Sequence, residues 1–174
     1  MRARQLFLLL IPLGACQTKP NATTVVEQFY TTTIGAQITG APTPEQLTTL
    51  TPYLSDTLRA LLAGARRQHD ADAARSPDEK PAFADGDLFS SLFEGPNAAE
   101  VVADSARGDQ RVVSVRMTYR GAEPAVTWID RVVVTTERDR PVVDDIEYGG
   151  QWGFASKGTL RKSLQAALAP PPQP

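Results

Sequence analysis

Few side chains in this sequence are suited to covalent or proton-transfer chemistry. Cys16 is the single cysteine and His69 the single histidine among 174 residues. His69 lies in the charged stretch Arg66-Arg67-Gln68-His69-Asp70, a pattern typical of a solvated helix face. One histidine cannot form a histidine-rich metal site, so we expect neither a metal nor a cofactor. The chemistry that remains belongs to Cys16 and to a few carboxylates and tyrosines.

Cys16 follows a short apolar leader. Arg2 and Arg4 precede the apolar residues 6–13, and small residues come next. Because a bilayer span needs about 20 apolar residues, this pattern indicates a signal peptide for export and cleavage. The run Leu13-Gly14-Ala15-Cys16 resembles the lipobox of bacterial lipoproteins. The alternative is an ordinary secreted protein with a cysteine at this place by chance.

The lipobox resemblance implies cleavage between Ala15 and Cys16, with two or three acyl chains attached at Cys16. Several chains together give a stable membrane anchor, whereas one chain binds reversibly. An acylated Cys16 is not available as a nucleophile. Gln17 stands where an aspartate tends to retain such proteins at the inner membrane. The resemblance therefore implies an outer-membrane anchor with the domain facing the periplasm.

Composition limits the remaining functions. Removing the leader, which holds two arginines and no acid, changes the formal net charge from −2 to −4. A mildly acidic chain offers no electrostatic case for binding nucleic acid. We expect a signal peptide over 1–15, a lipidated tether over 16–22, one folded domain over 23–169 and a disordered proline-rich tail over 170–174.

Helix start signals occur in the first half of the chain and again near its end. Thr24 and Glu27 match a capping box ahead of an apolar stripe. A second helix is expected from Thr43-Pro44-Glu45-Gln46 and a longer one from Ser55, so that residues 50–75 form a kinked helical pair. Thr159 precedes leucines at four-residue spacing, which predicts a last helix.

The second half of the chain alternates between apolar and polar residues. This pattern predicts strands over 100–106, 110–120, 126–137 and 141–148, joined by short polar turns. Residues 76–97 form a long loop with several aromatic side chains. Helices followed by a meander of strands predict an α+β fold, with N-terminal helices packed on a curved antiparallel sheet of about four strands and a C-terminal helix.

Several short segments resemble a group of bacterial lipoproteins of unknown function. The clearest are Trp128-Ile129-Asp130-Arg131-Val132-Val133-Val134, Pro141-Val142-Val143-Asp144-Asp145-Ile146-Glu147-Tyr148 and Gly86-Asp87-Leu88-Phe89-Ser90-Ser91. The domain of that group is similar to the cystatin-like roll shared with nuclear transport factor two and ketosteroid isomerase. The resemblance implies a pocket between sheet and helices, and the residues that could line it are Tyr30, Trp128, Asp130, Asp144 or Asp145, and Tyr148.

These pocket residues have a catalytic and a structural interpretation. Asp130 or Asp145 between apolar neighbours could have a raised pKa and act as a general base, as in an isomerase or dehydratase. In the structural interpretation, Asp130 pairs across strands. Asp144 and Asp145 would then accept backbone amides at a nearby helix start, and Tyr30 would belong to the core. The structural interpretation is the stronger.

The sequence therefore favours a non-catalytic, lipid-anchored module that binds a protein or an envelope component. The partner surface would be the aromatic loop with Phe83, Phe89 and Phe93. An immunity protein that blocks a rival's toxin is one version of this hypothesis. A small-molecule pocket, with or without isomerase-like chemistry, and a structural envelope lipoprotein are the alternatives.

Overall fold

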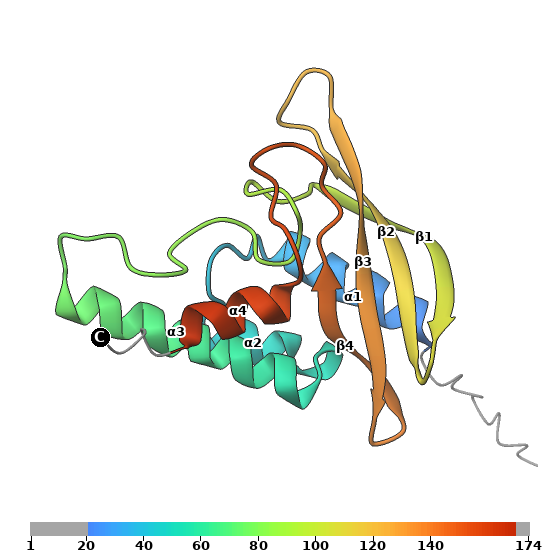
Figure 1. Ribbon diagram of the computed structural model, residues 1–174, viewed down its shortest axis with the longest axis horizontal. Coiled ribbons are helices and arrows are strands. Elements are labelled where there is room, and N and C mark those ends of the chain that lie inside the picture. The colour runs from blue at the N-terminus through green and yellow to red at the C-terminus, as the bar shows by residue number, and fades with distance from the viewer. Residues whose placement is uncertain (1–20, 170–174) are drawn as a thin grey trace, which may run out of the picture.

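The computed structural model describes residues 21–169. The predicted signal peptide, the lipobox with Cys16 and the proline-rich tail lie outside these residues. The described elements occur in the order α1 (Ala22–Gly35), α2 (Pro44–Leu50), the 3-10 turn η1 (Thr51–Tyr53), α3 (Asp56–Arg75), β1 (Ala98–Arg107), β2 (Gln110–Tyr119), β3 (Val126–Glu137), β4 (Arg140–Glu147) and α4 (Leu160–Leu168). The predicted α+β fold with a C-terminal helix is confirmed (Figure 1).

Side-chain caps fix where the helices begin. Helix α2 begins where the sequence predicted, and Thr43 and Gln46 form a capping box there. Thr159 caps α4 as predicted, and Ser55, from which the longer helix was predicted to start, is the cap of α3. The prediction for α1 was wrong: its cap is Asn21, whose side chain accepts the backbone N–H of Thr24. An asparagine side chain is as good an acceptor at this position as a hydroxyl, so the helix begins two residues before Thr24.

The four strands form one antiparallel sheet in the order β1-β2-β3-β4, with each strand beside its sequence neighbour. Val115 pairs with Asp130 and Met117 with Trp128 across β2 and β3. A bulge between β3 and β4 leaves Asp144 without a direct partner. Because one residue is skipped there, Val143 and Ile146 both lie buried despite their three-residue spacing.

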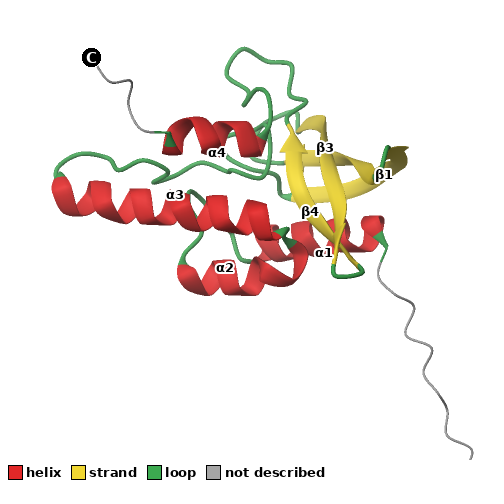
Figure 2. Ribbon diagram, turned by 60° about the horizontal axis from the view of Figure 1, so that its bottom comes forward, coloured by secondary structure: helices red, strands yellow, loops and turns green. Residues whose placement is uncertain are grey.

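One face of the sheet packs against the helices. Helix α1 contacts β1, β2 and β4, while α3 and α4 pack against each other and against β4. Figure 2 shows α1 lying across the sheet and the other helices extending beyond its β4 side. The core combines both layers, with Val26, Phe29, Leu58, Leu62, Val113, Val115, Met117, Val132 and Leu164 fully or almost fully buried. Among residues 21–169, every helix falls short of the length and apolar character that crossing a membrane requires.

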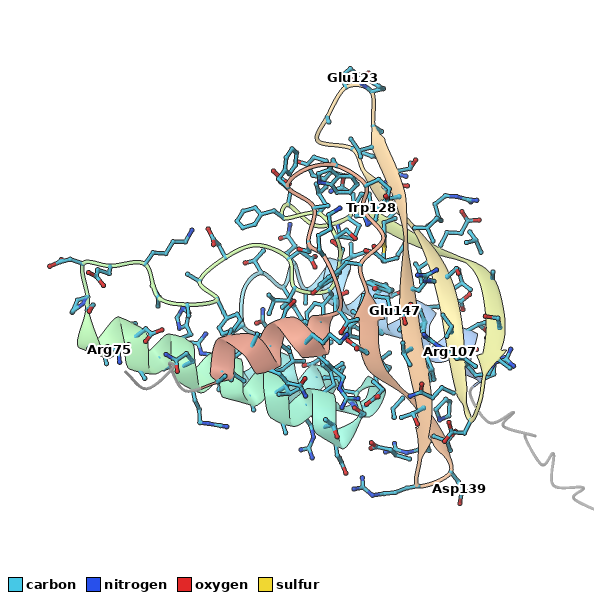
Figure 3. All side chains as sticks on the ribbon, viewed as in Figure 1. Arg75, Arg107, Glu123, Trp128, Asp139 and Glu147 are labelled. Atoms are coloured by element: carbon cyan, nitrogen blue, oxygen red, sulfur yellow. The ribbon has the colours of Figure 1, made fainter. Side chains whose placement is uncertain are left out.

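The molecule has two distinct ends along its sheet. Asn21 and Ala22 share a pocket with Asp109 of the β1–β2 turn and Pro141 near the β3–β4 turn, so the chain enters the fold at that end. The 148–159 loop and the later part of the 76–97 loop lie toward the other end, where Trp128 is also found, whereas the 76–97 loop begins beside Arg75 at the far end of α3 (Figure 1 and Figure 3). The first described residues, Asn21 and Ala22, therefore lie at the end of the sheet opposite Trp128.

Candidate functional site

Asp130 is the centre of a buried polar cluster that joins both long loops to the sheet. The side chain has no solvent exposure. Its Oδ2 atom accepts the backbone N–H of Ser91 at 2.8 Å and the indole Nε1–H of Trp128 at 2.9 Å. Its Oδ1 atom accepts the backbone N–H of Gly149 at 2.8 Å and also the Ser91 hydroxyl. A carboxylate with both oxygens bonded in this way is stabilised by its donors, and it holds three segments together.

Local geometry explains why these particular residues meet. Trp128 and Asp130 are two residues apart on β3 and so share the inward face of the sheet. Gly149 passes directly over β3: a Cβ atom there would lie 1.9 Å from the Ile129 carbonyl oxygen. A Cβ atom on Gly150 would lie 2.8 Å from the Ser91 Cβ atom. Only glycine allows the backbone N–H groups to come this close to the cluster.

We expect Gly149→Ala to lower the free energy of unfolding by about 1–3 kcal/mol, because the added methyl group must displace backbone. Gly153→Ala is the matched control in the same loop, since a Cβ atom there meets nothing within 4 Å. Urea titration of both variants measures the difference. Equal unfolding midpoints for the two variants would show that the Gly149 backbone does not pass this close to Ile129.

Two tyrosine hydroxyls fix the segment just before Ser91. Tyr30 donates to the Phe89 carbonyl at 2.9 Å, and Tyr148 donates to the Leu88 carbonyl at 2.7 Å. Burial is the main cause that raises the pKa of both phenols far above the usual value, and the nearby carboxylates add to the shift. Both hydroxyls therefore stay protonated and act as hydrogen-bond donors.

Asp145 lies apart from the Asp130 cluster. Its Oδ1 atom accepts the backbone N–H of Arg161 at 2.9 Å, in the first turn of α4. The neighbouring Asp144 pairs with the Arg161 side chain. Of the predicted pocket residues, the structure thus brings Tyr30, Trp128, Asp130 and Tyr148 around residues 88–91, whereas Asp144 and Asp145 hold the start of α4.

The three phenylalanines of the predicted partner loop have different environments. Phe89 is 1% exposed and packs edge-to-face on Phe29, with ring centroids 5.3 Å apart. Phe83 is partly buried, and its carbonyl accepts the backbone N–H of Ala41. Phe93 is 54% exposed. Only Phe93 of the three offers a ring to a partner, and it is joined by Phe154, which is 79% exposed in the other long loop.

Asp87 is the titratable group that sequence analysis missed. It is partly buried and lines a pocket of about 260 Å³ between the C-terminal end of α1 and the 76–97 loop. Burial raises the pKa of its carboxyl from 3.8 to about 7, and the charge of Asp130 adds to the shift. A carboxyl that titrates near neutral pH is a recognised mark of a functional site. Position 87 gave no such signal, because an Asp in a Gly-Asp turn is usually solvated.

Backbone conformations near this pocket are unusual. Gln37 lines it with φ 48°, and Phe83, whose carbonyl bonds the neighbouring α1–α2 connection, has φ 55°. Left-handed backbone costs a non-glycine residue about 1–3 kcal/mol and often marks functional regions. Among residues 21–169, no group of three or more histidine, cysteine or acidic side chains is placed to hold a metal ion.

Comparison with known proteins supports one part of the sequence prediction. No protein-family model matches the chain. It is 32% identical over 121 residues to an uncharacterized lipoprotein of Escherichia coli K12, YbjP. The chain is thus similar to a bacterial lipoprotein of unknown function. The match covers 68% of this chain and 64% of that protein, so the chain spans less than two thirds of that relative's length.

Among solved structures, the chain matches a SEC-C motif containing protein from Rhodopseudomonas palustris, RPA3114. The sequence identity is 17% and the TM-score is 0.33, over 67% of this chain and 86% of that one.

Proposed function

We propose that this protein is a lipoprotein of the bacterial cell envelope, anchored by acyl chains on Cys16, whose domain is a non-catalytic binding module. The similarity to the E. coli lipoprotein carries the anchoring part of the proposal. The lipobox sequence Leu13-Gly14-Ala15-Cys16 supports it and supplies the attachment residue. Gln17 in place of an aspartate favours the outer membrane, with the domain facing the periplasm.

The contacts of the buried polar groups favour binding over catalysis. Asp130 uses both carboxylate oxygens on donors of the protein itself. Tyr30 and Tyr148 donate to backbone carbonyls and resist ionisation. A general base needs a free acceptor within reach of the substrate proton, and this cluster uses its acceptors to hold the fold. The exposed rings of Phe93 and Phe154, which lie on the two long loops, provide apolar surface for a partner.

Cys16→Ser tests the anchor. In a Gram-negative host we expect the unchanged protein in the detergent-soluble membrane fraction, with an acylated N-terminal peptide beginning at Cys16. The variant should lack the lipid mass and leave that fraction, because serine provides no thiol for the diacylglyceryl group. Mass spectrometry of the N-terminal peptide is the measurement. An unmodified Cys16 thiol in membrane-bound protein would contradict the proposal.

The binding role needs a separate test, because an anchor does not itself require a partner. We expect crosslinking in intact cells to recover an envelope component with the unchanged protein and to recover much less with Phe154→Ser. Val102→Ser is the matched control, since Val102 is a 38% exposed residue of β1. If all three proteins recovered the envelope component equally, Phe154 would not be part of the binding surface.

A further inference from the structure

The pocket beside Asp87 combines an apolar wall with two acidic side chains. Ile34, Ile38 and Pro96 form the apolar part, and Asp87 and Glu94 contribute carboxylates. The remaining lining residues are neutral and mostly polar: Thr33, Gln37, Thr39, Gly95 and Asn97. None of the described residues that line the pocket is a lysine or an arginine, so the two carboxyl groups have no cationic side chain beside them in this lining.

Backbone groups, and not a cationic side chain, hold Asp87 in place. Its Oδ1 atom accepts the backbone N–H of Phe89 at 2.5 Å, and its own N–H donates to the Phe93 carbonyl at 2.8 Å. Gly95, with φ +75°, packs against the carboxylate: a Cβ atom there would lie 2.5 Å from Oδ2. The loop is therefore built to keep this carboxylate at the pocket wall.

Burial makes the ionised form of Asp87 costly, and the charge of Asp130 adds to that cost. Asp130 on β3 is a second carboxylate, and Tyr30 on α1 and Tyr148 after β4 are neutral phenols. Glu94 lies on the same loop and lines the same pocket. A partly buried carboxylate that lacks a cationic neighbour is stabilised by a cation that enters the pocket from outside.

We propose that this pocket binds the ammonium group of a primary alkylamine, with the charge against Asp87 and Glu94 and the alkyl chain along Ile34, Ile38 and Pro96. The proposal names a ligand chemistry for the binding role above and rests on that role, but it does not depend on the lipid anchor. A free diamine and the lysine side chain of a partner protein both present this chemistry. Both combine an apolar stem with a charged tip, as the pocket walls require.

The test is calorimetric titration of the purified full chain in a neutral detergent with 1,5-diaminopentane and, separately, with a short lysine-containing peptide. We expect saturable binding at pH 8 that weakens about tenfold at pH 6, because Asp87 must be ionised to pair with the amine and protonation near pH 7 competes with it. Tighter binding of the peptide would identify a protein partner as the source, and tighter binding of the diamine a small metabolite.

Asp87→Asn should weaken binding at pH 8 by tenfold or more and remove its pH dependence. Glu94→Gln, at an exposed position where folding is not at risk, should weaken it severalfold. Asp78→Asn, in the exposed part of the same loop, is the matched control and should change nothing. No saturation with either probe, or binding unchanged in Asp87→Asn and Glu94→Gln, would overturn the proposal. Crosslinking that still recovered an envelope partner would then leave the proposed binding role intact.

Discussion

Asp130→Ala should lower the free energy of unfolding by about 3–5 kcal/mol, the largest effect we expect from a single substitution in this domain. The change removes a buried acceptor and leaves the N–H groups of Ser91, Trp128 and Gly149 without their partner. Each buried donor without an acceptor costs about 1–3 kcal/mol, and a cavity remains as well. Equilibrium unfolding in urea, followed by tryptophan fluorescence, measures the loss.

Asp78→Ala is the control for this measurement. Asp78 is exposed in the 76–97 loop, and surface substitutions of this kind usually change stability by less than about 0.5 kcal/mol. A loss below 1 kcal/mol in Asp130→Ala would show that the three donors find other acceptors. The cluster would then not be what holds the two loops on the sheet.

Asp87→Asn should remove a pH dependence of stability. The folded-state pKa of about 7 lies above the ordinary value of 3.8, so between these values the folded chain binds a proton that the unfolded chain has released. Stability from this group is therefore fully present below pH 4, is lost as the pH rises to 7 and is constant above that. The asparagine variant should be more stable than the unchanged protein at pH 8, by at most about 4 kcal/mol.

The free energy of unfolding is measured against pH for Asp87→Asn and for the unchanged protein. The difference between these two profiles reports Asp87 alone, because the other titrating groups are the same in both proteins. We expect the stability difference between variant and unchanged protein to grow from pH 4 to pH 7 and then to level off. Asp78→Asn should give a difference that stays constant across this range. A constant difference for Asp87→Asn as well would show that the carboxyl titrates at its ordinary pKa. The expected loss of amine binding between pH 8 and pH 6 would then be wrong too.

Local sequence signals predicted most of the fold, because each strand of the sheet pairs with the strand next to it in the sequence. The alternation of Val113, Val115 and Met117 predicted the buried face of β2, and the polar turns predicted a meander. The start of α1 was misplaced because Asn21 and Thr24 are both good caps and only packing chooses between them. The bulge at Asp144 gave no sequence signal, since it depends on how β4 aligns with β3.

The candidate site was less predictable, because its residues are joined across the fold. Trp128 and Asp130 could be placed together from their spacing on one strand. Ser91 and Gly149 could not, since their contact with Asp130 depends on how two long loops cross the sheet. Asp87 gave no signal either, because its pKa depends on burial that only the packed loop creates. The likeness to a cystatin-like roll stays a prediction.

The shared bonds of Ser91 have a dynamic consequence. Its side chain bonds Asp130 and accepts the N–H of Gly150, and its carbonyl accepts the N–H of Ser156. These bonds join the 76–97 and 148–159 loops at Ser91, so we expect the amides of Ser91, Gly150 and Ser156 to exchange with solvent as one cooperative unit. A ligand that reduces the motion of the 76–97 loop at Asp87 should also reduce the motion of the 148–159 loop, which carries Phe154. We therefore expect binding at Asp87 and binding at Phe154 to favour each other.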